Sequence, residues 1–108
     1  MFAFVTHMRA KPGKREALLR LNRTMQDATA GEDGVPIYVF HTAADAPDDF
    51  YFYDLYESQA AYDAHCATPA FQNMMRSFGE LAELVSAVKL VPFGPIKSEP
   101  VRAAVAER

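Results

Sequence analysis

Residues 50–57, FYFYDLYE, carry aromatic or aliphatic side chains at both alternating sets of positions. Residues 36–42, PIYVFHT, show the same pattern, and the polar stretch AADAPDD between the two segments favours a hairpin turn. Successive side chains of a β-strand point to opposite faces of the sheet. Both faces of the sheet that contains this hairpin must therefore be covered by other apolar groups.

Two further strands are predicted near the ends of the chain. Residues 2–10, FAFVTHMRA, are rich in aromatic and branched side chains and stop at Lys11-Pro12-Gly13. Residues 86–92, SAVKLVP, form the last predicted strand. The segment IKSEPVRAAVAER that follows is predicted to be a tail.

Helical periodicity marks three other segments. Pro12 suits a helix start, and an amphipathic pattern that includes Leu18 and Met25 predicts a helix that ends between Gly31 and Gly34. Ser58 can cap a short helix over residues 59–66, and Thr68-Pro69 is typical of a new helix start. The apolar stripe of this third helix extends to Leu84 or Val85, with Gly79 as a predicted break or kink. The stripe consists of Phe71, Met74, Met75, Phe78, Leu81 and one of these two last positions.

The order strand, helix, strand, strand, helix pair, strand predicts an α+β fold of the ferredoxin-like, split βαβ type. Its four-stranded antiparallel sheet has helices on one face only. The apolar residues on the other face then have no cover within the chain. We expect a homodimer in which this open sheet face meets the same face of a second copy.

Composition limits the possible partners. The 108 residues suffice for one domain, and 14 acidic against 11 basic side chains give a net charge of -3 without a long run of one sign. This argues against a nucleic-acid or anionic-membrane surface and favours small neutral molecules or other protein chains. One cysteine cannot form an internal disulfide, the start of the chain lacks a signal-peptide pattern, and no apolar run approaches about 20 residues. We expect a soluble, cytoplasmic protein.

The stretch AYDAHCATPAF, residues 61–71, places His65 beside the only cysteine, Cys66. A cysteine–histidine nucleophile is disfavoured because neighbours on a helix point about 100° apart. No spacing predicts a metal site, and no glycine-rich loop predicts a phosphate, flavin or nicotinamide site. Because an imidazole exchanges protons near neutrality, His65 is the histidine best placed to act as a base.

The ordered set of motifs resembles the antibiotic biosynthesis monooxygenase (ABM) family. The matching residues are KPGK at 11–14, FYDLYES at 52–58, AH at 64–65 and TPAF at 68–71. The resemblance covers residues 1–92, predicted to be an ABM-like domain, and leaves residues 93–108 as a C-terminal tail. It implies a dimeric α+β barrel and a monooxygenase that needs no cofactor and oxidises a small quinol- or phenol-like aromatic substrate with dioxygen.

Some positions depart from the family pattern. Asp54 stands where glutamate is usual, and Tyr56 where tryptophan is usual. The haem-degrading branch of the superfamily uses asparagine, tryptophan and histidine at positions that correspond to Thr6, His65 and Met75. Since all three differ, we do not expect haem degradation.

The resemblance also implies a substrate pocket between the helices and the sheet. His65 is the expected catalytic base, and Asp54 is expected to orient its ring or to share the proton. Thr6 and Tyr56 are expected to donate hydrogen bonds to substrate oxygens. An apolar lining is expected from Phe71, Met74, Met75 and Phe78.

Other interpretations remain open for the same residues. His65 can instead bond the helix junction, Asp54 can form an ion pair with Arg9, Lys89 or Arg76, and the apolar stripe can be simple core. His7 and His41 are interpreted as surface or dimer-face residues. Two alternative functions fit the scaffold: an isomerase of a small keto or phosphorylated compound, in which Arg76 is the cation available for a phosphate, and a small-ligand-binding module without catalysis.

Overall fold

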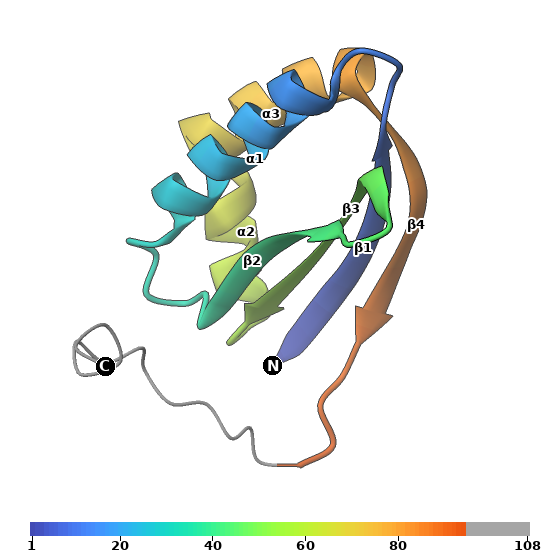
Figure 1. Ribbon diagram of the computed structural model, residues 1–108. Coiled ribbons are helices and arrows are strands. Elements are labelled where there is room, and N and C mark those ends of the chain that lie inside the picture. The colour runs from blue at the N-terminus through green and yellow to red at the C-terminus, as the bar shows by residue number, and fades with distance from the viewer. Residues whose placement is uncertain (95–108) are drawn as a thin grey trace, which may run out of the picture.

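Four strands form one antiparallel sheet, and three helices cover one of its faces (Figure 1). The computed structural model describes residues 1–94, so the predicted tail lies outside the described residues from residue 95 onward. The strands are β1 (Phe2–Ala10), β2 (Ile37–Ala43), β3 (Ala46–Tyr56) and β4 (Ala82–Leu90). The helices are α1 (Arg15–Thr29), α2 (Gln59–Cys66) and α3 (Pro69–Leu81).

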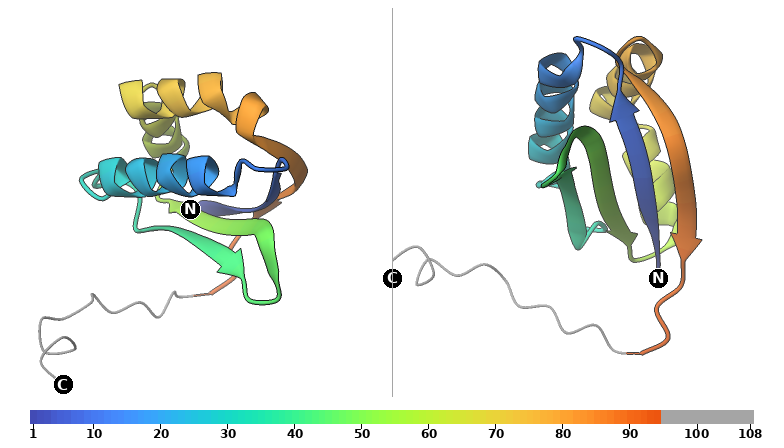
Figure 2. Two further views of the ribbon diagram at one scale, coloured as in Figure 1. Left: turned by 45° about the horizontal axis from the view of Figure 1, so that its top comes forward. Right: turned by 45° about the vertical axis from the view of Figure 1, so that its right-hand side comes forward.

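The strand order in the sheet is β2-β3-β1-β4, with every neighbouring pair antiparallel. This order follows from the two crossover connections, α1 and the α2–α3 pair, which return the chain across the same face (Figure 2). The predicted α+β, ferredoxin-like class is therefore confirmed. The central strands β1 and β3 lie under the helical layer, while β2 and β4 form the edges.

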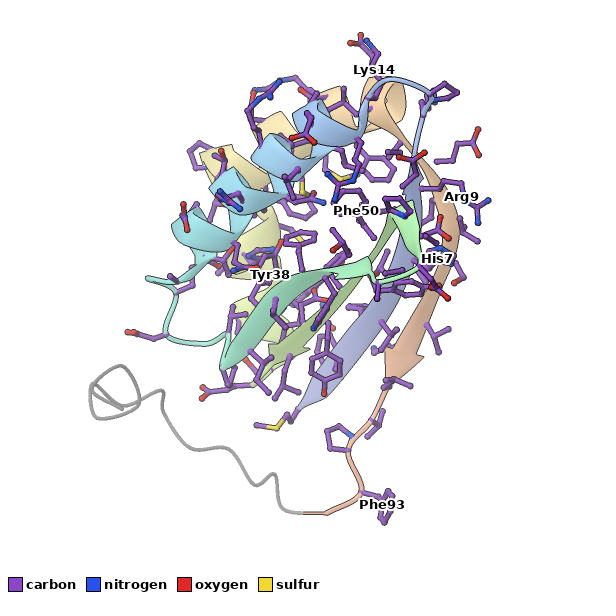
Figure 3. All side chains as sticks on the ribbon, in the orientation of Figure 1. His7, Arg9, Lys14, Tyr38, Phe50 and Phe93 are labelled. Atoms are coloured by element: carbon purple, nitrogen blue, oxygen red, sulfur yellow. The ribbon has the colours of Figure 1, made fainter. Side chains whose placement is uncertain are left out.

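Alternation along the strands separates the two sheet faces. Met8 of β1 and Phe50 of β3 are paired and point toward the helices, where they form a core cluster with Leu18 of α1. Figure 3 shows Phe50 between α1 and the sheet. Val5 and Tyr53, also paired, belong to the opposite face. The helices thus cover one of the two apolar faces that the sequence presents.

The helix pair begins as its capping residues predict. The Ser58 side chain accepts a hydrogen bond from the Ala61 backbone N–H at 3.1 Å, and α2 starts at Gln59. The Thr68 hydroxyl accepts one from Phe71 N–H at 3.2 Å, with Pro69 in the first turn of α3. These caps satisfy N–H groups that have no partner inside the helix.

Two boundaries near turns differ from the prediction. Pro12 does not begin α1 but belongs to a turn in which Gly13 has a φ of +75°. The helix α1 starts at Arg15 and ends at Thr29, before the predicted glycines. Glycine is the residue that adopts this left-handed conformation without strain. The hairpin turn is also shorter than predicted, because Ala43 pairs with Ala46 and the strands extend almost to its tip.

The end of α3 is a second difference. Gly79 does not end the helix, which continues to Leu81, and β4 begins at Ala82 instead of residue 86. The apolar residues Leu84 and Val85 continued the helical spacing by chance but lie in the strand. Within residues 1–94, no helix is long and apolar enough to cross a membrane.

Candidate active site between the sheet and the helices

A cavity of about 290 Å³ lies between the helix-facing side of the sheet and the helices. All eight residues predicted for the site line it: Thr6, Asp54, Tyr56, His65, Phe71, Met74, Met75 and Phe78. The lining also contains Phe4, Met8, Tyr38, Phe52, Tyr62, Leu84 and Ala87. Met75 and Leu84 remain 54% and 59% exposed, which places the mouth of the cavity between α3 and β4.

Asp54 brings a buried carboxyl group to this cavity. It sits on the central strand β3, between Phe4 of β1 and Tyr38 of β2, and is only 4% exposed. Its Oδ2 accepts a hydrogen bond from the Tyr56 hydroxyl, while its Oδ1 is buried with no hydrogen-bond partner among the described residues. Burial raises the pKa of Asp54 to about 6, although the hydrogen bond from Tyr56 acts in the opposite direction.

Two tyrosines beside this carboxyl are kept in their neutral form. Burial and the neighbouring Asp54 raise the pKa of Tyr56 well above its usual range, and burial likewise raises that of Tyr38. Both phenols therefore remain protonated over the range in which proteins are stable. They can donate hydrogen bonds but do not serve as bases.

His65 is the second ionisable group of the cavity and is 1% exposed. Its ring lies against three aromatic rings, those of Tyr38, Phe71 and Tyr56, at centroid distances of 5.1, 5.3 and 5.5 Å. Its Nδ1 lies 3.0 Å from Oε1 of Glu32. Among residues 1–94, the hydrogen bond of the ring is thus made through Nδ1.

The helix junction is bonded through the backbone of His65 and not through its ring. Thr68 donates from both its hydroxyl and its backbone N–H to the His65 carbonyl, at 2.8 and 3.2 Å. The interpretation that His65 bonds the helix junction therefore holds for its backbone carbonyl, whereas its ring contacts Glu32. The hydrogen bond of the imidazole goes to Glu32, and none of the hydrogen bonds found within residues 1–94 joins the ring to Asp54.

The interpretation that Asp54 forms an ion pair with Arg9, Lys89 or Arg76 is wrong, because each of these side chains contacts another group. Arg9 bonds Asp49 at 2.7 Å, Lys89 lies over the Phe2 ring, and Arg76 approaches Asn73. Arg76 does not line the cavity, which removes the cation that the sequence offered for a substrate phosphate. Among the described residues, no group of three His, Cys, Asp or Glu side chains is arranged to hold a metal ion.

Cys66 does not act as a partner of His65. Its pKa is raised, mainly by burial, whereas a cysteine nucleophile needs a lowered one. His7 and His41 lie away from the cavity: His7 stacks on Tyr51, and His41 Nδ1 lies 3.1 Å from the Tyr51 carbonyl. A second hollow of about 250 Å³ between α1 and β2 contains none of the predicted site residues.

Sequence reasoning missed several lining residues. Phe4 and Phe52 share the strand faces of Thr6 and Asp54, so alternation alone could have found them. Tyr38 pairs with Asp54 and follows from the same rule once the hairpin register is known. Glu32 lies in a loop without periodicity, and no sequence signal connects it to His65.

The family comparison agrees with this geometry. The family model for antibiotic biosynthesis monooxygenase matches residues 1–77. The chain belongs to the ABM family. The matched range includes β1, α1, the hairpin, α2 and most of α3, and thus most of the cavity lining.

Solved structures show the same fold. Rv0793 from Mycobacterium tuberculosis is 27% identical with a TM-score of 0.79, and the match covers 89% of this chain and 98% of that one. Protein SO0527 from Shewanella oneidensis is 29% identical with a TM-score of 0.72, covering 82% and 84%. An uncharacterised Synechocystis protein, sll1783, is 25% identical over 84 residues, and the match covers 78% of this ABM chain and 57% of the Synechocystis protein's length.

The raised pKa of Asp54 predicts a pH-dependent effect on stability. The folded-state value of about 6 lies above the ordinary 3.8, so the folded protein favours the neutral carboxyl and loses stability as the pH rises through this interval. Asp54→Asn fixes a neutral side chain. We expect its free energy of unfolding, relative to wild type, to increase by about 2 kcal/mol between pH 4 and pH 8 in urea titrations.

Asp27→Asn, at an exposed position of α1, is the matched control and should show a difference that does not change with pH in this way. A wild-type advantage over Asp54→Asn that grows toward pH 8 would contradict the burial of an unpaired carboxyl.

Proposed function

We propose that this chain is a cofactor-independent monooxygenase that oxidises a small, quinol- or phenol-like aromatic substrate with dioxygen. The observation that carries the proposal is the buried Asp54 carboxyl, which lines an aromatic cavity and has one oxygen without a hydrogen-bond partner among the described residues. Membership of the ABM family supports a monooxygenase-type activity.

The cavity suits a flat aromatic molecule with one or two oxygens. Its lining is largely aromatic and sulfur-containing, and its volume of about 290 Å³ lies near the lower end of the range for small-molecule sites. Three of its polar groups, Asp54, Tyr56 and Thr6, come from adjacent strands of the sheet. A substrate hydroxyl placed there gives the Oδ1 of Asp54 the partner that it lacks.

The proposed reaction begins with proton transfer from this hydroxyl. Asp54 Oδ1 or His65 Nε2 accepts the proton, and the phenolate that forms is electron-rich enough to transfer one electron to dioxygen. The resulting radical and superoxide combine by forming a C–O bond at a ring carbon that carries hydrogen. Loss of water then leaves a quinone.

The atoms balance without any further reagent. One phenol and one dioxygen molecule give one quinone and one water, one oxygen atom entering each product. The substrate supplies the electrons, and the two protons released from its hydroxyl and its C–H bond leave in the water. The apolar lining keeps bulk water away from the reactive intermediates.

Oxygen uptake with a panel of hydroquinones and anthrones, in buffer treated with a chelator, tests this function. We expect uptake with at least one member and a roughly 100- to 10,000-fold lower kcat for His65→Ala and for Asp54→Asn, since general-base catalysis contributes about that much. Asp27→Asn, at an exposed position of α1 outside the cavity lining, is the control and should retain activity.

The alternatives give different outcomes. Absence of uptake with every member would contradict the proposal. Unchanged turnover in His65→Ala would contradict a catalytic role for this residue. Binding of a panel member without oxygen uptake, with the same affinity in His65→Ala, would favour a binding module.

We also propose that the working form is a homodimer that meets through the open sheet face. The helices lie on the other side of the sheet (Figure 2). The open face presents aliphatic side chains, including Val88 at 51% and Leu90 at 40% exposure. Val88 lies directly across from Val5, which continues the apolar surface onto the central strands. A second copy offers the same apolar surface in return.

The dimer proposal predicts that a charge at its centre separates the subunits. Val88→Glu should sediment as a monomer in analytical ultracentrifugation, because pairing would bury two carboxylates in an apolar interface. Ala60→Glu, at an exposed position of α2 in the helical layer, should remain dimeric. A wild-type chain that sediments as a monomer at micromolar concentration would contradict the proposal.

A further inference from the structure

We infer that Glu32, in the loop between α1 and β2, is a positioning residue that sets the tautomer and direction of the His65 ring. Its effect on turnover rests on the proposed function, whereas its effect on the ring does not.

The contact between the two side chains determines which ring nitrogen carries hydrogen. A carboxylate only accepts hydrogen bonds, so the 3.0 Å approach of Glu32 Oε1 requires a hydrogen on Nδ1. In the neutral ring the lone pair is then on Nε2, the nitrogen that does not contact Glu32. Because His65 lines the cavity, this is the arrangement in which the ring can accept a proton from a substrate.

Because the pair is largely buried, its contact can fix the orientation of the His65 ring. His65 is 1% exposed, and the Glu32 side chain is 22% exposed. The three surrounding aromatic rings pack against the imidazole and limit where it can turn, but packing alone does not distinguish Nδ1 from Nε2. The carboxylate of Glu32 makes that distinction.

The loop is placed against α2 by contacts that do not involve Glu32 itself. The Gly34 carbonyl accepts a hydrogen bond from the Glu57 backbone N–H at 3.0 Å. A Cβ added to Gly34 would lie 2.5 Å from the Cβ of Ala61, so the backbone approaches the helix more closely than any other residue allows.

This close approach lies on the same side of α2 as the histidine. Ala61 and His65 are four residues apart, and residues at this spacing share a helix face. Gly34 therefore contacts one turn of that face while Glu32 contacts the next. Two turn hydrogen bonds shape the loop between these points. The Glu32 N–H donates to the Thr29 carbonyl at 2.9 Å, and the Val35 N–H donates to the Glu32 carbonyl at 3.2 Å.

The test is nitrogen NMR of the imidazole rings in protein labelled with ¹⁵N-histidine, at a pH where the spectra show neutral rings. The chain has three histidines, so a His65→Ala spectrum assigns the relevant signals. In wild type we expect His65 to carry hydrogen on Nδ1. In Glu32→Ala the fraction of His65 rings with hydrogen on Nδ1 should fall. Asp33→Asn, at the exposed neighbouring position, should leave this fraction unchanged.

Gly34→Ala tests the placement of the loop independently. The added methyl group should displace the loop and weaken the Nδ1–H form although Glu32 is intact. Removing the opposing methyl group in Gly34→Ala/Ala61→Gly should restore it. Far-UV circular dichroism confirms that each variant is folded.

The inference is overturned if wild-type His65 carries hydrogen on Nε2, or if Glu32→Ala retains the Nδ1–H form. If a hydroquinone or anthrone is oxidised, we also expect Glu32→Ala to lower kcat about tenfold or more with a smaller change in KM, because a misplaced base is costly. The NMR result stands whether or not oxygen is consumed, which separates a failure of this inference from a failure of the proposed function.

Discussion

The removal of the Asp54 carboxyl from water is the constraint on which the rest of the site depends. A central strand under a helical layer usually carries apolar side chains, and here one hydrogen bond from Tyr56 only partly compensates the burial. The pKa of Asp54 is consequently raised to about 6, and the ionised form destabilises the fold near neutrality. Ionisable groups that are buried in this manner gather at functional sites.

The two acid–base groups reach the cavity from different layers, and each has its own partner. Asp54 belongs to the sheet and is paired with Tyr56 two residues along the same strand, whereas His65 belongs to α2 and is paired with Glu32 from a loop. The space between them remains open because α3 lies over it without fully burying any of its own side chains. The ferredoxin-like fold thus holds both side chains in place and leaves the cavity between them.

Local patterns predicted most of the fold, since alternation, caps and turn residues act over a few positions. The capping residues Ser58 and Thr68 predicted the first residues of α2 and α3 correctly. The continuation of α3 through Gly79 and the early start of β4 depend on packing, which residue spacing does not encode. The predicted site residues all line one cavity, because strand faces and the family resemblance point to the same positions. Glu32 could not be found, because its contact with His65 spans 33 positions and arises from the path of a loop.

The most direct test of this account is a ¹³C NMR titration of the Asp54 side-chain carboxyl, assigned by its absence in Asp54→Asn. The account predicts a midpoint near pH 6 in the ligand-free protein, as burial requires. A midpoint at the ordinary aspartate value of 3.8 would mean that the carboxyl is well solvated or well paired, and would contradict its assignment as the group around which the cavity is organised.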